Sequence, residues 1–342
     1  MKELIQLQQQ IVPELLDIME QRYIILEQVQ TLQPIGRRTL AENANLTERQ
    51  VRGEIHFLQQ QGLIEVTKRG MFVTKKGTLL LEKLSKLMKV IKGLSVLEKK
   101  VGETLNINEV IVVSGNSDED PEIKQEMGKA CVDILKQMVK KDSTIAVTGG
   151  TTMAALADVM TPFNQEKNVL FVPARGGSGE KMENQAGRIV AEMARKTGGK
   201  YRLFHAPELL SDSAYESLSK EPSIKEVLNF IKNADIVIHG IGDALTMAER
   251  RKTPSDIIEI LKEEQAVGEA FGYYFNGDGE IVYKLKTLGI HLEDLDRADY
   301  VIAVAGGKSK AKAIQAYAKQ GKSDLLITDS AAAEEIVRGN PL

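Results

Sequence analysis

Hydrophobic positions follow two different rhythms along this chain. In the first hundred residues they recur at helical spacing, in Leu4–Gln30, which predicts a helix that Pro13 starts or kinks, and in Leu79–Glu98, which predicts a second long helix. From Val110 onward, short β-branched runs alternate with amphipathic segments. This alternation is typical of an α/β domain, in which helices cover both faces of a mostly parallel sheet.

The alternation also gives the expected order of strands and helices. The strands are expected at Val110–Val113, Ile145–Thr148, Val169–Val172, Arg202–His205, Ile236–His239, Val301–Val304 and Leu325–Thr328. The helices are expected at about Lys124–Met138, Met153–Met160, Asn184–Arg195, Ile224–Lys232 and Lys310–Gln320. A hairpin of Phe271–Phe275 and Ile281–Lys286 interrupts this order, because Asn276-Gly-Asp-Gly279 is a turn sequence.

Residues 34–73 carry the signals of two helices joined by a turn, followed by two short strands. A short helix is expected at about Arg38–Asn43, and a second over Thr47–Gln61, because Thr47-Glu-Arg-Gln50 matches a capping box. Strands at Leu63–Val66 and Met71–Val73 then form a wing around a basic turn. This order is the pattern of a winged helix-turn-helix.

The charge of this segment indicates what it binds. Basic residues outnumber acidic ones eight to four from Arg37 to Lys76, although the whole chain has a formal charge of −3. Arginine and glutamine read base edges, and basic wing residues contact phosphates, so we expect operator double-stranded DNA as a partner. The alternative is a solvated helix pair that contacts protein. The candidate DNA-binding residues are Arg37, Arg38, Thr47, Arg49, Gln50, Arg52, Lys68 and Arg69.

Glycine-rich turns follow four of the predicted strands. In Gly149-Gly-Thr-Thr152 the strand enters a tight turn and then a helix, where backbone N–H groups and the helix dipole suit a phosphate. Taken alone, such a turn is a connection without a ligand at least as often as it is a phosphate site. Three more turns, Gly176-Gly-Ser-Gly179, Gly240-Ile-Gly242 and Gly306-Gly307, also follow strands. Because the carboxyl ends of parallel strands share one edge, we expect one floor of backbone donors.

Cationic residues near these turns are candidates for phosphate binding. They are Arg175, Arg250, Arg251, Lys308 and Lys310. For Arg251 and Lys308 a solvated charge is the better expectation. For Arg175 a phosphate contact is the better expectation, because it lies between a Pro-Ala pair and a glycine-rich loop.

Length and composition limit the remaining possibilities. The 342 residues, 42% of them hydrophobic, suggest two domains, which we place at residues 1–92 and 93–342. A lone Cys131 excludes a disulfide or a multi-cysteine metal site within the chain, and it fits the cytoplasm. The polar start is unlike a signal peptide, and no apolar run approaches the roughly 20 residues of a membrane span.

Two nucleotide-binding motifs are incomplete in this sequence. Gly307-Lys-Ser309 and Gly321-Lys-Ser323 resemble the end of a P-loop, but Ile302 and Ala316 stand where its first glycine should be. The turn Gly240-Ile-Gly242 lacks the third glycine of a dinucleotide fingerprint. The histidines show no metal spacing. We therefore expect no cofactor, no metal and no catalytic residue.

The combined motifs resemble the SorC/DeoR-type sugar-responsive transcriptional repressors, and among them the branch that controls central glycolytic genes. The resemblance covers essentially the whole chain. It is carried by Pro34-Ile-Gly-Arg-Arg38, Thr148-Gly-Gly-Thr-Thr152, Phe171-Val-Pro-Ala-Arg-Gly-Gly177, His239-Gly-Ile-Gly242, Glu269-Ala-Phe-Gly-Tyr-Tyr-Phe-Asn276 and Ala305-Gly-Gly307.

This resemblance implies a Rossmann-like effector domain similar in fold to sugar-phosphate isomerases and deaminases. It implies a homo-oligomer, a tetramer on DNA, that represses a glycolytic operon until fructose-1,6-bisphosphate binds. One phosphate and the sugar would be held by Gly149, Gly150, Thr151, Thr152, Arg175, Gly177 and Lys310. Arg250 would meet the second phosphate, and Gln185 and Glu269 would hydrogen-bond hydroxyls. A sugar-phosphate enzyme fused to a DNA-binding domain and a nucleotide-sensing regulator are the alternatives.

Overall fold

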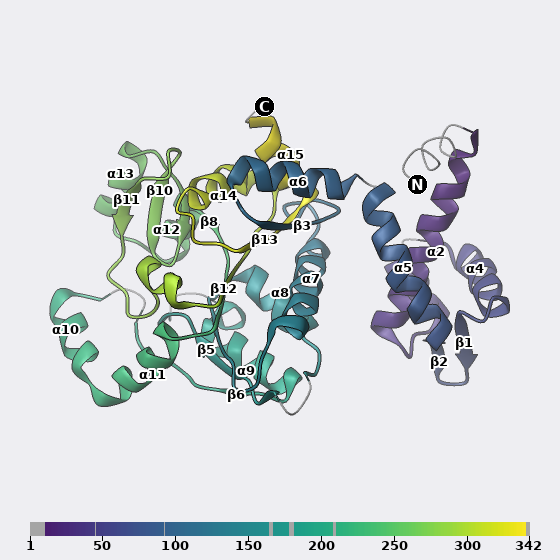
Figure 1. Ribbon diagram of the computed structural model, residues 1–342, viewed down its shortest axis with the longest axis horizontal. Helices are drawn as coiled ribbons and strands as arrows, with labels where there is room; N and C mark the ends of the chain where they lie inside the picture. Colours follow the sequence, from purple (N-terminus) through teal and green to yellow (C-terminus); the bar gives the residue numbers. More distant parts are fainter. Residues whose placement is uncertain are drawn as a thin grey trace. The chain divides into compact units, whose positions relative to one another are not determined.

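The computed structural model describes residues 11–44, 46–91, 93–163, 167–177, 181–207 and 210–339. The chain divides into two compact units between Ser95 and Val96 (Figure 1). The division thus falls three residues after the boundary expected from the sequence, which placed residue 92 at the end of the first domain. No helix of the described residues is long and apolar enough to cross a membrane.

The first unit is a winged helix-turn-helix, as the sequence predicted. Its elements are α2 (Pro13–Leu32), α3 (Arg37–Asn43), α4 (Glu48–Gln60), β1 (Ile64–Thr67), β2 (Gly70–Val73) and α5 (Lys75–Ile91). Pro13 lies in the first turn of α2 and starts that helix, whereas the expected earlier part of the helix falls in residues 1–10, outside the described residues. Strands β1 and β2 pair antiparallel around Lys68 and Arg69.

The prediction of one long helix at Leu79–Glu98 is wrong, because two helices occupy this region. The first, α5, ends at Ile91, and the second, α6 (Leu94–Leu105), begins after Gly93. Gly93 has a φ of +69°, a left-handed conformation that ends helices and that glycine adopts without strain.

The second unit is built on a seven-stranded sheet whose registered strand pairs are all parallel. The strand order is β3-β13-β12-β7-β4-β5-β6. The strands are β3 (Glu109–Val113), β4 (Thr144–Val147), β5 (Leu170–Pro173), β6 (Lys200–Tyr201), β7 (Ile236–His239), β12 (Tyr300–Val304) and β13 (Leu325–Asp329). The α/β fold predicted from the sequence is therefore confirmed.

Helices of the second unit pack on this sheet or on elements beside it. They are α7 (Glu122–Met138), α8 (Thr151–Val159), α9 (Ala186–Thr197), α10 (Asp212–Lys220), α11 (Pro222–Lys232), α14 (Ala311–Ala318) and α15 (Ser330–Gly339), with 3-10 turns η2 (Met182–Asn184), η3 (Leu292–Arg297) and η4 (Lys308–Lys310). One face of the sheet, which includes Val147, Ile238 and Val304, packs on α7, α8 and α9 in a single buried core.

The expected strand at Arg202–His205 is wrong. Strand β6 occupies Lys200–Tyr201 instead, and its pairing with β5 ends when the Arg202 N–H donates to the carbonyl of Phe171 at 3.0 Å. Among the described strands, β6 is at the edge of the sheet and pairs on one side only.

A second, four-stranded sheet has the order β11-β10-β9-β8 and is antiparallel. Its strands are β8 (Gly242–Asp243), β9 (Ala266–Ala270), β10 (Tyr273–Asn276) and β11 (Ile281–Lys284). The expected hairpin is thus β10–β11, but the prediction began its first strand at Phe271 and missed β8 and β9. It also missed the helices α10, α12 (Ala244–Arg250), α13 (Ser255–Glu263) and α15.

Candidate functional site

A pocket opens where four neighbouring strands of the parallel sheet end. Strands β12, β7, β4 and β5 are adjacent in the sheet, and each is followed by one of the four glycine turns. The sequence prediction that these turns share one edge is confirmed. The Gly306-Gly307 turn does not line the pocket itself. The lining residues are Thr148, Gly149, Gly150, Thr151, Thr152, Met153, Arg175, Gly176, Gly177, Asn184, Gln185, Ala186, Gly240, Ile241, Gly242, Met247, Arg250, Arg251, Glu269, Phe271 and Lys310.

All ten residues that the sequence assigned to effector binding line this pocket. Their contacts with a ligand remain a prediction. Four of them come from the turn after β4 and the start of α8, and two from the turn after β5; the others lie before α9, at the end of α12, in β9 and in η4. Residues separated by more than 160 positions are therefore brought to one site by the strand order.

The turn after β4 presents the start of α8 to the pocket. Gly150 is the N-cap residue, has a φ of +115°, and has no side-chain cap. The sequence prediction needs one refinement, because the Gly150 N–H already donates to the carbonyl of Asn184 at 2.8 Å. The donors that remain for an anion are those of the first turn of α8, at Thr151 and Thr152, where the helix dipole is positive.

Arg175 is fixed in place from its backbone outward. The N–H of Ile290 donates to the carbonyl of Ala174 at 2.8 Å, and the N–H of Gly176 donates to the carbonyl of Leu288 at 3.1 Å. Gly289 lies between them, and a Cβ there would come within 2.5 Å of the Cβ of Arg175. The segment around Gly289, which the sequence did not identify, therefore sets the direction of the Arg175 side chain.

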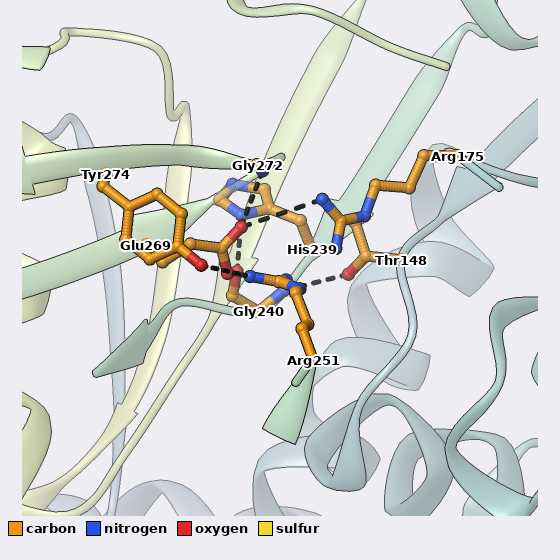
Figure 2. Close-up of polar contacts among 8 residues, drawn as sticks. All are labelled: Thr148, Arg175, His239, Gly240, Arg251, Glu269, Gly272 and Tyr274. Atoms are coloured by element: carbon orange, nitrogen blue, oxygen red, sulfur yellow. Dashed lines mark hydrogen bonds and ion pairs between the residues drawn. The ribbon is translucent and has the colours of Figure 1, made fainter. Parts of the chain in front are cut away.

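A buried carboxylate joins two arginines at the back of the pocket (Figure 2). Glu269 Oε2 accepts a hydrogen bond from Arg251 Nη2 at 3.0 Å, and its Oε1 lies 3.8 Å from Arg175 Nη1. Oε1 also accepts from the N–H of Gly272 at 2.6 Å, and Arg251 Nη1 donates to the hydroxyl of Tyr274 at 3.2 Å. The expectation that Arg251 is solvated is wrong, because its side chain is 4% exposed.

The charge state of Glu269 follows from these neighbours. Burial raises the pKa of Glu269, but the charges of Arg251 and Arg175 and the hydrogen bonds from Arg251 and Gly272 outweigh it, so its pKa lies below the usual value. The sequence assigned Glu269 to sugar hydroxyls. In the structure, both of its oxygens already accept hydrogen bonds from the protein, which gives the residue a structural role in addition.

Lys310 and Lys308 have different surroundings, although they lie two residues apart. Lys308 is 60% exposed on its side chain and pairs with Glu335, as expected for a solvated charge. Lys310 lines the pocket, and burial, then the charges of Lys124 and Arg250, lower its pKa to about 8. Its loop is held because Asp329 Oδ2 accepts from the N–H of Gly307 at 2.6 Å.

The candidate DNA-binding residues lie at the surface of the first unit. All eight are exposed, on α3, on α4 or at its N-cap, and in the turn between β1 and β2. The predicted capping box is present, because the Gln50 N–H donates to Thr47 Oγ1 at 3.3 Å and the Thr47 N–H donates to Gln50 Oε1 at 3.0 Å. Thr47 and Gln50 therefore start α4 first of all, and their contact with DNA remains a prediction.

Known proteins match both units. A family model described as a "Putative sugar-binding domain" matches residues 89–338, and one described as a "CggR N-terminal DNA binding domain" matches residues 18–88. The chain is 54% identical over 339 residues to the central glycolytic genes regulator of Priestia megaterium and 47% identical over 338 residues to that of Bacillus subtilis, covering 99% of both chains in each comparison. The chain belongs to the family of central glycolytic genes regulators.

A solved structure of the same type supports the fold. The "putative SorC family transcriptional regulator from Enterococcus faecalis" is 47% identical, with a TM-score of 0.67, over 70% of this chain and 99% of that one. A central glycolytic genes regulator is a sugar-responsive transcriptional repressor with a DNA-binding domain, and it is not an enzyme. The enzyme alternative left open by the sequence is thereby excluded.

A buried histidine lies at the end of one of the four strands. His239, at the end of β7, is fully buried against Phe271. Its Nε2 lies 3.1 Å from the hydroxyl of Tyr317, with which it forms a hydrogen bond. Burial lowers its pKa to about 4. It packs as a neutral ring and is not among the residues that line the pocket. Among the described residues, no His, Cys, Asp and Glu side chains group as a metal site.

Proposed function

We propose that this chain, working in the cytoplasm, represses a glycolytic operon, and that fructose-1,6-bisphosphate bound in the pocket relieves the repression. The family membership supports the repressor, and the names of the two relatives support the glycolytic target. The effector, the tetramer on DNA and the direction of the response are proposals that rest on the pocket and on the resemblance of the motifs.

The charge of the pocket is the observation that carries the choice of effector. Among the described residues, the charged lining groups are one carboxylate, Glu269, and four cations, Arg175, Arg250, Arg251 and Lys310. Glu269 offsets one cation, so three positive charges face the ligand. A sugar with two phosphates offsets them more completely than a sugar with one, and charge-assisted hydrogen bonds to phosphate are among the stronger polar contacts.

The pocket has two places for anionic groups. The start of α8 offers backbone donors and threonine hydroxyls at Thr151 and Thr152. Arg250, at the end of α12, and Lys310 supply cationic side chains from other elements. The charge of Arg250 is one of the causes that lower the pKa of Lys310. Bound phosphates would tie α8, α12 and η4 together.

Relief of repression requires that the effector discriminate between two states. A ligand shifts an equilibrium only by its differential affinity, so the bisphosphate has to bind the arrangement with low DNA affinity better than the arrangement that holds the operator. Linking α8, α12 and η4 is the local change available for this discrimination. By reciprocity, operator DNA weakens binding of the bisphosphate by the same factor.

The test is a titration of fructose-1,6-bisphosphate into the complex of the full chain with operator duplex. We expect the bisphosphate to release or rearrange the complex, which fluorescence anisotropy and analytical ultracentrifugation report. Fructose-6-phosphate and adenine nucleotides serve as controls and should act only at much higher concentration. An operator complex unchanged by saturating bisphosphate would contradict the effector, and a stronger response to nucleotides would favour the nucleotide-sensing alternative.

A further inference from the structure

Helix α4 has an exposed face on which, within the described part of the chain, no other element packs. Val51, Ile55 and Leu58 are buried and fix one side of the helix. At about 100° per residue, Gly53 lies on the opposite side. Arg49 is one turn before it and His56 one turn after it, so both flank the glycine on the same exposed face.

No contact or backbone angle in the described part of the domain requires a glycine at position 53. It lies in the middle of α4 and is exposed, and its φ is outside the range that favours glycine. A Cβ built on it meets nothing within 4 Å in the described part of the chain. Glycine at an exposed helical position weakens helix formation relative to alanine by about two- to five-fold in the equilibrium. The glycine is therefore a disadvantage to the isolated chain.

The residues around Gly53 show what approaches this face. Arg49, His56 and Gln60 are exposed, and His56 Nε2 lies 3.0 Å from Gln60 Nε2, which holds these two side chains together. Glu54 is turned away and pairs with Arg22 at 2.7 Å. The face therefore carries cationic and amide groups without an acid, and these groups suit guanine and adenine edges in the major groove.

We propose that Gly53 is the point of closest approach between α4 and the DNA duplex, and that Arg49, His56 and Gln60 read base edges around it. This inference rests on the DNA-binding function of the domain and adds which face reads the sequence. A side chain at position 53 would hold the helix away from the floor of the groove. Base contacts would then be lost, while the phosphate contacts of the wing would be kept.

The test compares Gly53→Ala and Gly53→Leu in the full chain. The probe is a duplex that the unmodified chain selects from a randomised library, and a duplex of scrambled sequence reports non-specific binding. We expect alanine to weaken binding to the selected duplex several-fold and leucine to weaken it by at least about tenfold. Binding to the scrambled duplex and the dependence of affinity on salt should change little, because no phosphate contact is removed.

Stability gives an independent readout with the opposite sign. Hydrogen exchange of the α4 amides should become slower in Gly53→Ala by about two- to five-fold, because alanine favours the helix. Weaker specific binding by a more stable helix cannot result from misfolding. Gln30→Leu, on the exposed part of α2, is the matched control for added apolar bulk and should leave affinity unchanged.

Two results would overturn the inference. If Gly53→Leu binds the selected duplex as tightly as the unmodified chain, position 53 does not approach DNA, although the DNA-binding function stands. If the unmodified chain selects no duplex at all, the DNA-binding function fails and the inference fails with it. If leucine disturbs the fold of α4, the alanine variant decides, because equal affinity in that variant also overturns the inference.

Discussion

Arg251 and Glu269 form a buried ion pair, with 3.0 Å between Nη2 and Oε2 and about 5% exposure of each side chain. The same carboxylate also lies 3.8 Å from Arg175. One anion thus contacts two guanidinium groups in the wall of the pocket. Glu269 keeps the empty pocket stable by reducing repulsion between the cations, and it leaves enough positive charge for a phosphate to bind.

Glu269→Gln should destabilise the effector domain strongly. The substitution keeps the shape of the side chain but leaves two buried arginines without their counter-charge, and breaking a buried pair in this way costs roughly 3–5 kcal/mol. Urea unfolding of the full chain measures the loss. Because bound phosphate would replace the lost charge, fructose-1,6-bisphosphate should restore part of the stability. An unfolding curve identical to that of the unmodified chain would show that the pair is energetically neutral.

Lys310→Met should weaken binding of fructose-1,6-bisphosphate, and Lys308→Met should not. Lys310 lines the pocket and would make a charge-assisted contact worth about 1.5–3 kcal/mol, or roughly ten- to a hundredfold in affinity, whereas Lys308 lies outside it. Isothermal titration calorimetry compares the two. Equal losses in both variants would contradict the assignment.

The Lys310 ammonium also predicts a pH dependence. Its pKa of about 8 is depressed from 10.5, so the folded domain loses this proton at lower pH than the unfolded chain does. The stability of the empty domain should therefore rise as pH increases from about 8 toward 10.5, while bisphosphate affinity falls over the same range because the cation is lost. Titrations at pH 7 and pH 9 check the second statement, and Lys310→Met should abolish the difference.

Gly289→Ala should disturb the pocket without touching the ligand. A Cβ at Gly289, whose φ is +149°, would lie within 2.5 Å of both the carbonyl oxygen of Ala174 and the Cβ of Arg175. Such overpacking costs roughly 1–3 kcal/mol and would move Arg175. We expect lower thermal stability together with weaker bisphosphate binding. Gly177→Ala is the control for stability, since a Cβ there meets nothing within 4 Å of the described chain.

Mild acid should destabilise the effector domain through His239. Its folded pKa of about 4 lies below the usual 6.5, so as pH falls from 6.5 to 4 the unfolded chain takes up a proton that the folded one does not. Stability should fall across that window. The contribution of Glu269 is lost only at lower pH, because its own pKa is depressed. The double variant His239→Phe with Tyr317→Phe should reduce the slope above pH 4.5, as denaturation at several pH values would show; His291, whose pKa burial also lowers, supplies the rest.

Local signals in the sequence were enough to predict several elements of the fold. The capping box at Thr47, the basic wing at Lys68 and Arg69, and the glycine turns after β4, β5, β7 and β12 each depend on a few neighbouring residues. They follow from turn chemistry and helix capping, which act over short stretches of chain. For that reason the winged helix-turn-helix and the strands that carry the four glycine turns were predicted, whereas β8, β9, α10, α12, α13 and α15 were missed.

Features that depend on distant partners could not be predicted in this way. Arg251 is charged and ends a short helix, so it looked solvated, and its burial exists only because β9 brings Glu269 and β10 brings Tyr274. The contact of Gly289 with Arg175 joins positions 114 residues apart and has no local pattern. A usable signal was present for Glu269, because it is the one acidic residue in the otherwise small and apolar strand β9.

The place of β13 in the sheet has a consequence for how the regulator is made. Strand β3 pairs with β13, which also pairs with β12, so the sheet cannot be completed until Leu325–Asp329 has left the ribosome. The DNA-binding domain, made first, can fold much earlier. Each newly synthesised chain therefore passes through an interval in which it has a DNA-binding domain but no sensor.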